Sequence, residues 1–187
     1  MAEAPTEIRI ETERLLLRLF EPDDLEEMCS IWGDPFVTRF LPGGKPFPRE
    51  RVASFLPRTL EFWREHGFGQ LAVVHRETGR VIGYCGFKFL EETPDVELLY
   101  GLARAYWNQG LTTEAAAACL RFAFEETALE RICAIAQPGN VGSYRVMEKL
   151  GMKFEKAARF DQLDVLYYSI TRARFQPGRA KYILRAG

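Results

Sequence analysis

The sequence predicts a mixed α/β protein: a mostly antiparallel sheet of seven strands, about four helices and one parallel strand pair. Three observations predict this class. Strand-like and helix-like segments alternate along the chain. Three strand-like segments follow one another with short connections between residues 70 and 102, which favours antiparallel pairing. A long helical segment then leads to the next strand, and a helical crossover of this kind joins parallel neighbours.

The first third of the chain predicts one strand and two helices. Residues 15–20 (LLLRLF) form a short apolar run that ends at a Glu-Pro pair, which indicates a strand. A helix is predicted from Pro22 to about Trp32, because acidic residues in its first turn interact favourably with the helix dipole. Residues 33–48 are rich in Pro, Gly and Phe and predict a loop. The helical pattern of residues 49–66 contains Pro57, which we expect to kink or split that helix.

The middle of the chain changes to a strand period and then to a helix. Residues 70–75 and 81–90 predict a hairpin joined by a Thr-Gly turn, and residues 96–102 predict a third strand beside it. Residues 113–127 carry Ala, Leu, Cys and Phe on every side of a helical pattern. Because a helix that is apolar all round has no face suited to solvent, we expect it inside the protein.

The last third predicts three more strands and one helix, at residues 131–136, 142–150 (the helix), 153–160 and 163–175. The tail, residues 177–187, shows no clear pattern. No repeat, low-complexity tract or Gly/Ser linker interrupts the sequence, and 187 residues are the length of one ordinary domain. We therefore expect residues 1–187 to form one domain.

Composition argues against several classes of function. The chain has 25 basic and 26 acidic residues, whereas a general nucleic-acid binder shows a basic excess. The four cysteines form no C-x-x-C pair, so no metal or redox site is predicted; they are Cys29, Cys85, Cys119 and Cys133. No apolar stretch approaches the ~18 residues of a membrane span, and the first residues lack an apolar signal region. We therefore expect a cytoplasmic protein that binds neither nucleic acid nor membrane.

Residues 106–115 (YWNQGLTTEA) join a predicted strand to the N-terminus of the predicted buried helix. The first amides of a helix have no partner within it, and the helix dipole adds about half a positive charge there. No acidic residue precedes Glu114 in the first turn, and Gly110 lets the backbone approach a ligand closely. A pyrophosphate is the natural ligand of such a loop. The loop alone leaves open the alternative of an ordinary tight turn with water on its amides.

The same loop resembles the acyl-CoA pyrophosphate loop of the GNAT N-acetyltransferase superfamily, in the form of its RimJ/RimL-like branch. Three further stretches match that branch in order and spacing: residues 12–18 (TERLLLR), residues 96–100 (VELLY), and Asn140-x-x-Ser143 followed by residues 148–152 (EKLGM). The resemblance covers about residues 8 to 176, and four motifs in register are a specific signal.

Two loop positions depart from the branch pattern. Asn108 replaces a glycine, and Thr112 replaces a small residue. Asparagine is among the best non-glycine residues in left-handed backbone, so we expect the loop conformation to survive. The Thr112 hydroxyl adds a group that can bond a phosphate oxygen.

The resemblance implies a fold whose parallel strand pair is splayed around acyl-CoA, and a direct transfer of acetyl from acetyl-CoA to a primary amine in a ternary complex. The amine belongs to a protein N-terminus or to a small molecule. No metal is implied, and we expect a monomer or homodimer. The residues expected to bind the acyl-CoA are Tyr100, Leu102, Trp107, Asn108, Gln109, Gly110, Leu111, Thr112, Thr113, Asn140 and Ser143.

Glu97 is the candidate general base. On a strand it shares one face with Leu99, so we expect it to be half-buried, and burial raises the pKa of a carboxyl towards the range of a useful base. A solvated glutamate at a strand edge is the alternative that the residues leave open. The resemblance implies the base, acting directly or through water.

Asn140 and Ser143 begin the last predicted helix, so helix capping is one interpretation of both. The resemblance implies that Asn140 holds the pantetheine arm and that Ser143 protonates the departing thiolate. In the wider superfamily a tyrosine protonates the thiolate from a position that is Met147 here, and methionine has no proton to donate. Tyr144 and water remain the substitutes for Ser143.

Two other interpretations of the chain stay open. A non-catalytic acyl-CoA-binding module that senses CoA would keep the loop but lose Glu97, which is present. Phe36, Phe40 and Phe47 indicate a partly apolar acceptor site, although phenylalanines in a loop also serve packing. The sequence does not identify the amine or the preferred acyl chain.

Overall fold

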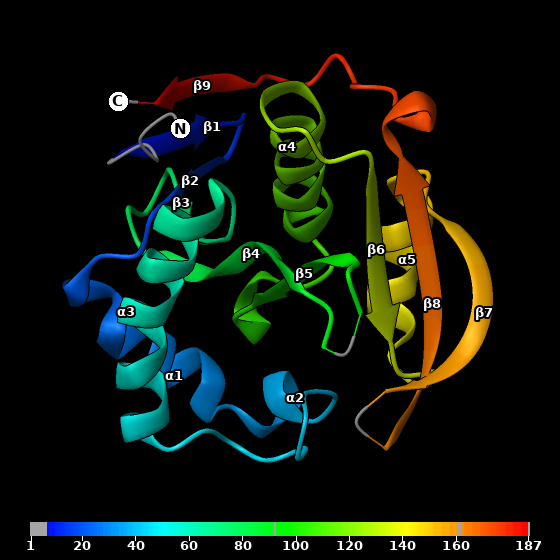
Figure 1. The fold of residues 1–187 in the computed structure, drawn as a ribbon. Coiled ribbons are helices and arrows are strands. Elements are labelled where there is room, and N and C mark those ends of the chain that lie inside the picture. The colour runs from blue at the N-terminus through cyan, green and yellow to red at the C-terminus, as the bar shows by residue number, and fades with distance from the viewer. Residues whose placement is uncertain (1–6, 92, 161, 187) are drawn as a thin grey trace.

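The computed structural model describes residues 7–91, 93–160 and 162–186. Within these residues one nine-stranded sheet has the order β7-β8-β6-β5-β4-β3-β2-β1-β9 (Figure 1). The strands are β1 (Ile8–Glu11), β2 (Leu15–Arg18), β3 (Gln70–His75), β4 (Val81–Phe89), β5 (Val96–Leu102), β6 (Arg131–Ala136), β7 (Lys153–Phe160), β8 (Leu163–Thr171) and β9 (Ile183–Ala186). Every neighbouring pair is antiparallel except β5 and β6. The predicted mixed class with one parallel pair is therefore confirmed.

The predicted count of seven strands is wrong, because β1 and β9 also join the sheet. Each has four residues, and they pair with each other at the end of the sheet (Figure 1). Ile8 and Ile10 of β1 are buried, but two apolar residues are too few to establish a strand period. β9 lies in the tail that showed no pattern, and it becomes a strand by pairing with residues from the opposite end of the chain.

The described residues contain five α-helices and three single 3₁₀ turns. They are η1 (Pro22–Asp24), α1 (Leu25–Gly33), α2 (Pro35–Thr38), α3 (Arg49–His66), η2 (Arg104–Tyr106), α4 (Leu111–Glu126), α5 (Val141–Lys149) and η3 (Arg172–Arg174). The predicted loop at 33–48 thus contains a short helix, which Asp34 caps by accepting a hydrogen bond from the Phe36 amide at 2.8 Å. Residues 172–174 form η3, so the strand predicted to end at 175 ends earlier.

Pro57 does not split α3, which runs as one helix through it. Pro57 and Ala53, whose carbonyl loses its helical partner, are both exposed. Water can therefore satisfy that carbonyl, and the expected split is avoided.

Two apolar clusters lie on opposite faces of the central strands. α4 packs with residues such as Val73 and Leu98, and α1 and the first part of α3 pack with residues such as Ala72 and Leu99. Neighbouring residues of one strand therefore point to different clusters. α4 is buried along most of its surface, as its all-round apolar pattern predicted.

β5 and β6 separate soon after they meet. Their only paired position among the described residues is Glu97 with Cys133, whereas β6 and β8 pair from Arg131 to Ala136 (Figure 1). The carboxyl ends of β5 and β6 consequently diverge, and the helices that follow them, α4 and α5, begin beside this opening. In α/β sheets a ligand site is expected at such a position.

Candidate active site

A cavity of about 560 Å³ opens where β5 and β6 diverge. Its lining comes from α1, α3, the central strands, α5 and the hairpin of β7 and β8. Four of the predicted site residues line this cavity: Glu97, Tyr100, Asn140 and Ser143. The structure thus brings together predicted residues that are separated by more than forty positions in the chain.

Glu97 is more deeply buried than the expected half. Only 6 % of it is exposed, because β5 is covered by neighbouring strands and by packed side chains on both faces. Lys88 lies directly opposite on β4, with its Nζ 3.4 Å from Glu97 Oε2. That geometry is an ion pair but not a hydrogen bond, so Oε2 has no hydrogen-bond partner among the described residues. Burial raises the pKa of Glu97, and Lys88 lowers it in part.

Tyr100 and Ser143 are joined across the opening. The Tyr100 hydroxyl donates to the Ser143 carbonyl at 2.9 Å and lies 3.3 Å from the Ser143 Oγ. Burial raises the pKa of Tyr100 well above its ordinary value, although the contact with Ser143 opposes this, so the hydroxyl stays protonated and remains a donor. Tyr144, the alternative to Ser143, packs against the main core instead of lining the cavity.

Asn140 stands at the N-cap of α5, but its side chain makes no capping hydrogen bond. Its carbonyl accepts from the amides of Ser143 and Tyr144 at 3.0 and 3.4 Å. Capping by the side chain therefore does not account for this asparagine. Asn140 lines the cavity, and its side-chain amide, which has no hydrogen-bond partner among the described residues, offers both a donor and an acceptor.

The loop before α4 has the shape expected of an anion site. Asn108 and Gly110 adopt left-handed backbone, with φ of 59° and 76°. The first helical bond runs from the Glu114 amide to the Gly110 carbonyl at 3.0 Å. The amides of residues 108–113 have no hydrogen-bond partner among the described residues. The expectation that asparagine tolerates this conformation is confirmed.

Trp107 differs from the rest of the predicted pyrophosphate loop. Its amide donates to the Arg104 carbonyl at 3.2 Å, and its indole Nε1 donates to the Leu102 carbonyl at 2.7 Å. The amides that remain available therefore begin at Asn108. Leu102, also predicted to bind the acyl-CoA, is buried in the core and is absent from the described lining of the cavity.

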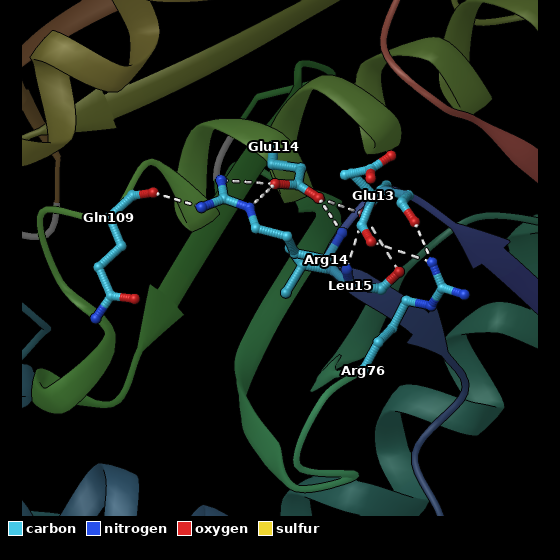
Figure 2. A network of polar contacts seen from close by, with 7 residues as sticks. Glu13, Arg14, Leu15, Arg76, Gln109 and Glu114 are labelled. Atoms are coloured by element: carbon cyan, nitrogen blue, oxygen red, sulfur yellow. Dashed lines mark hydrogen bonds and ion pairs between the residues drawn. The ribbon is translucent and has the colours of Figure 1, made fainter.

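Sequence reasoning missed the residue that holds this loop, Arg14. Its Nε donates to Glu114 Oε2 at 2.7 Å, and its Nη1 donates to the Gln109 carbonyl at 2.9 Å (Figure 2). Thr12 Oγ1 also donates to Glu114, at 2.7 Å. Desolvation opposes ionisation of Glu114, but these hydrogen bonds outweigh it and lower the pKa of the carboxyl. Glu114 is therefore ionised and tied to Arg14 instead of capping its own helix.

Arg76 anchors the segment that carries Arg14. Its Nη1 donates to the carbonyls of Thr12 and Glu13 at 2.9 and 3.1 Å (Figure 2). The Arg76 amide donates to the Arg14 carbonyl at 2.9 Å. The motif at 12–18 and the loop at 106–115 are thus in direct contact, and the motif resemblance was the sequence signal that pointed to both.

Among the described residues, no group of three or more His, Cys, Asp or Glu side chains is arranged to hold a metal ion. No helix in the described ranges combines the length and the apolar character that crossing a membrane requires.

Comparisons with known proteins identify a family and several relatives of the chain. The model of the acetyltransferase (GNAT) domain matches residues 14–153. The chain is 33 % identical over 150 residues to YnaD, an uncharacterized N-acetyltransferase of Bacillus subtilis (strain 168), covering 79 % of this chain and 84 % of YnaD. A GNAT-family acetyltransferase structure from Bacillus anthracis has a TM-score of 0.76 at 30 % identity, covering 88 % of this chain and 99 % of that one. The ribosomal-protein-S5-alanine acetyltransferase of Vibrio fischeri has a TM-score of 0.76 at 20 % identity, over 90 % and 99 %, and shows the fold alone.

Proposed function

We propose that this chain, which belongs to the GNAT acetyltransferase family, moves an acetyl group from acetyl-CoA to a primary amine by direct transfer in a ternary complex. Family membership makes the chain an acetyltransferase, as its motifs predicted; the donor, the acceptor and the order of binding are the proposal. One observation carries it. The buried carboxylate of Glu97, whose Oε2 has no hydrogen-bond partner in the part of the chain that the structure describes, lines the same cavity as Asn140 and Ser143.

The loop before α4 fits the pyrophosphate of acetyl-CoA, which supplies the acetyl group as a thioester. The amides of residues 108–113 lack partners, and they stand at the N-terminus of a sixteen-residue helix whose dipole favours an anion. A Cβ added at Gly110 would lie 3.6 Å from Arg14 Nη2, so a cationic group also stands beside these amides. Asn140 would hold the pantetheine arm at the opening between β5 and β6.

Glu97 would take the proton of the amine. At pH 7 a lysine-type amine of pKa ~10.4 loses its proton at a cost of about 4.6 kcal/mol, and an α-amine of pKa ~8 at about 1.4 kcal/mol. A carboxylate whose pKa is raised by burial is a stronger base than an exposed one. Lys88, 3.4 Å away, opposes part of this rise in pKa by favouring the ionised carboxylate.

Ser143 would donate a hydrogen bond to the departing sulfur. Its hydroxyl lies at the opening, and Tyr100 fixes the backbone that carries it. A thiol of pKa ~8.5 leaves fairly readily as a thiolate, so this donor is expected to contribute a modest factor to the rate.

The test is release of free thiol from acetyl-CoA in the presence of amines and N-terminal peptides. We expect release that depends on the amine and that yields the N-acetylated product by mass spectrometry. A binding module would instead gain heat stability with CoA and release no thiol with any acceptor. The RimJ/RimL-like branch, the cytoplasm as the compartment and a monomeric or homodimeric state stay predictions.

A further inference from the structure

The wall of the cavity that α3 forms carries two arginines that the reaction above does not use. Arg51 and Arg58 both line the cavity and both belong to α3, with Phe55 between them. Their spacing of four and three residues places all three side chains along one face of the helix. The cavity thus has one wall that alternates positive charge with an aromatic ring.

Arg51 is held in place by an aromatic ring. Its guanidinium lies over the ring of Phe47, with its central carbon 3.7 Å from the ring centroid. This stacking uses the face of the guanidinium and leaves the N–H groups at its edge available. No carboxylate among the described residues forms an ion pair with Arg51.

Arg58 also lacks an acidic partner among the described residues. Its Nε and Nη2 donate to the carbonyl and the hydroxyl of Ser54 at 2.9 and 3.2 Å, one turn earlier in α3. Arg49 offers a contrast: it belongs to the same helix but does not line the cavity, and both of its Nη atoms bond Glu26, at 2.9 and 2.5 Å. Three arginines of this helix, Arg51, Arg58 and Arg64, have no ion pair among the described residues, and two of them, Arg51 and Arg58, line the cavity.

The charges around the cavity favour an anionic ligand at this wall. Glu97 and Lys88 form a pair that balances itself, and Glu91, an exposed residue, is the remaining acidic residue of the lining within residues 7–91, 93–160 and 162–186. Arg51 and Arg58 therefore leave an excess positive charge. Arginine binds a carboxylate through two parallel hydrogen bonds, which gives such a pair both strength and orientation.

We propose that the acceptor is a primary amine that also carries a carboxylate, which Arg51 and Arg58 bind while the amine reaches Glu97. This inference rests on the proposed acetyl transfer and names its class of substrate. The carboxylate belongs either to a small amino acid or to an acidic side chain near a peptide N-terminus. Both sources offer the same chemistry to the arginines, and the experiment has one arm for each.

The experiment compares acceptors that differ only in the carboxylate. The small-molecule arm pairs 5-aminopentanoate with 5-aminopentanamide, and the peptide arm pairs the amides of Ala-Glu-Ala and Ala-Gln-Ala. In each pair the carboxylate is remote from the amine, so its effect on the amine pKa is small. We expect kcat/KM for the acidic member to exceed that of the neutral member about tenfold in at least one arm, as for a charged hydrogen bond.

The variants Arg51→Gln and Arg58→Gln should each reduce this ratio towards one. The ratio is measured on one enzyme sample, so it does not depend on how much of the variant is folded. Arg49→Gln is the matched control from the same helix and should keep the full ratio. Acetylation of both members of each pair at equal kcat/KM would overturn this inference alone, as would an unchanged ratio in both cavity variants. Acetylation of no amine at all would overturn the proposed function as well.

Discussion

Arg14 and Glu114 form an ion pair that joins the segment before β2 to the first turn of α4. Two guanidinium nitrogens of Arg14, Nε and Nη2, each lie 2.7 Å from the same carboxylate oxygen of Glu114. The third nitrogen reaches the Gln109 carbonyl in the loop. The unpartnered amides of this loop are therefore held from both sides, by the helix that follows and by a distant part of the chain.

Arg14→Ala should weaken the stabilisation by CoA more than it lowers the stability of the unliganded protein. The Arg14 side chain is 45 % exposed, and an ion pair this exposed contributes at most about 1 kcal/mol to folding. Its loss would still free the loop to move, so ordering the loop would oppose CoA binding. The measurement is the shift in Tm on adding CoA. Arg9→Ala is the control, because Arg9 is 46 % exposed and pairs with Glu7. A full CoA shift in Arg14→Ala would contradict the role of the clamp.

Gly110→Asp should fold but lose the CoA-dependent shift in Tm. Gly110 has a φ of 76°, and a Cβ there meets only Arg14 Nη2, at 3.6 Å. The substitution therefore adds backbone strain and a negative charge beside the free amides. Gly79→Asp carries the same strain at a φ of 67° in a turn with nothing within 4 Å, so it should keep the CoA shift. Gly110→Asn adds a side chain of similar size without the negative charge, so it should retain part of the CoA-dependent shift in Tm. If Gly110→Asp binds CoA as the unsubstituted protein does, the pyrophosphate lies elsewhere.

Glu97→Gln should lower kcat by about 10²- to 10⁴-fold without changing the CoA shift in Tm, because the glutamate is assigned to proton removal. Burial raises the pKa of Glu97, so kcat/KM of the unsubstituted enzyme should begin to fall, as pH decreases, above the range of an ordinary glutamate. The defect of the variant should shrink at high pH, where more of the amine is neutral. Initial rates between pH 5.5 and 9.5 measure both effects. Full activity of Glu97→Gln at pH 7 would place the base on another group.

The same substitution should stabilise the protein at neutral pH. A carboxyl whose pKa is raised by folding contributes stability that is present below its unfolded pKa and is lost as pH rises through the folded value. Glutamine does not ionise, so the variant does not lose this stability as pH rises. Lys88 stays hydrated without its partner, because its side chain is 37 % exposed. Tm of Glu97→Gln should therefore exceed that of the unsubstituted protein at pH 8, with the difference shrinking towards pH 4. An equal or lower Tm at pH 8 would mean that Lys88 fully compensates the buried charge.

Ser143→Ala should reduce kcat about tenfold or more, and Tyr144→Phe should change it little. Ser143 lies at the cavity and touches Tyr100, whereas Tyr144 packs against the core. A thiolate leaving group of pKa ~8.5 needs only modest help, which limits the expected loss. Kinetics with saturating acetyl-CoA compare the two variants. The reverse order would assign the donor to Tyr144, and near-normal rates for both would assign it to water.

Local patterns in the sequence were sufficient for most of the fold. β3, β4 and β5 have enough residues to show a strand period, and α4 is apolar all round, so each is recognisable from its own residues. The left-handed backbone of Asn108 is likewise predictable from the sequence, because it reflects the preference of one residue type. Glu97, Asn140 and Ser143 were identified by motif spacing, and the structure places all three on one cavity.

Tertiary structure alone decided the features that depend on distant partners. β9 exists because β1 pairs with it; β1 alternates over only four residues, too few to establish a strand period, and β9 shows no pattern of its own. Glu97 is almost fully buried because strands flank β5 on both sides, and Lys88 faces it through a register that no local pattern specifies. The contacts between Arg14 and Glu114 join residues about a hundred positions apart. Local preferences determine how a segment folds, whereas burial, register and long-range ion pairs arise only when the segments pack together.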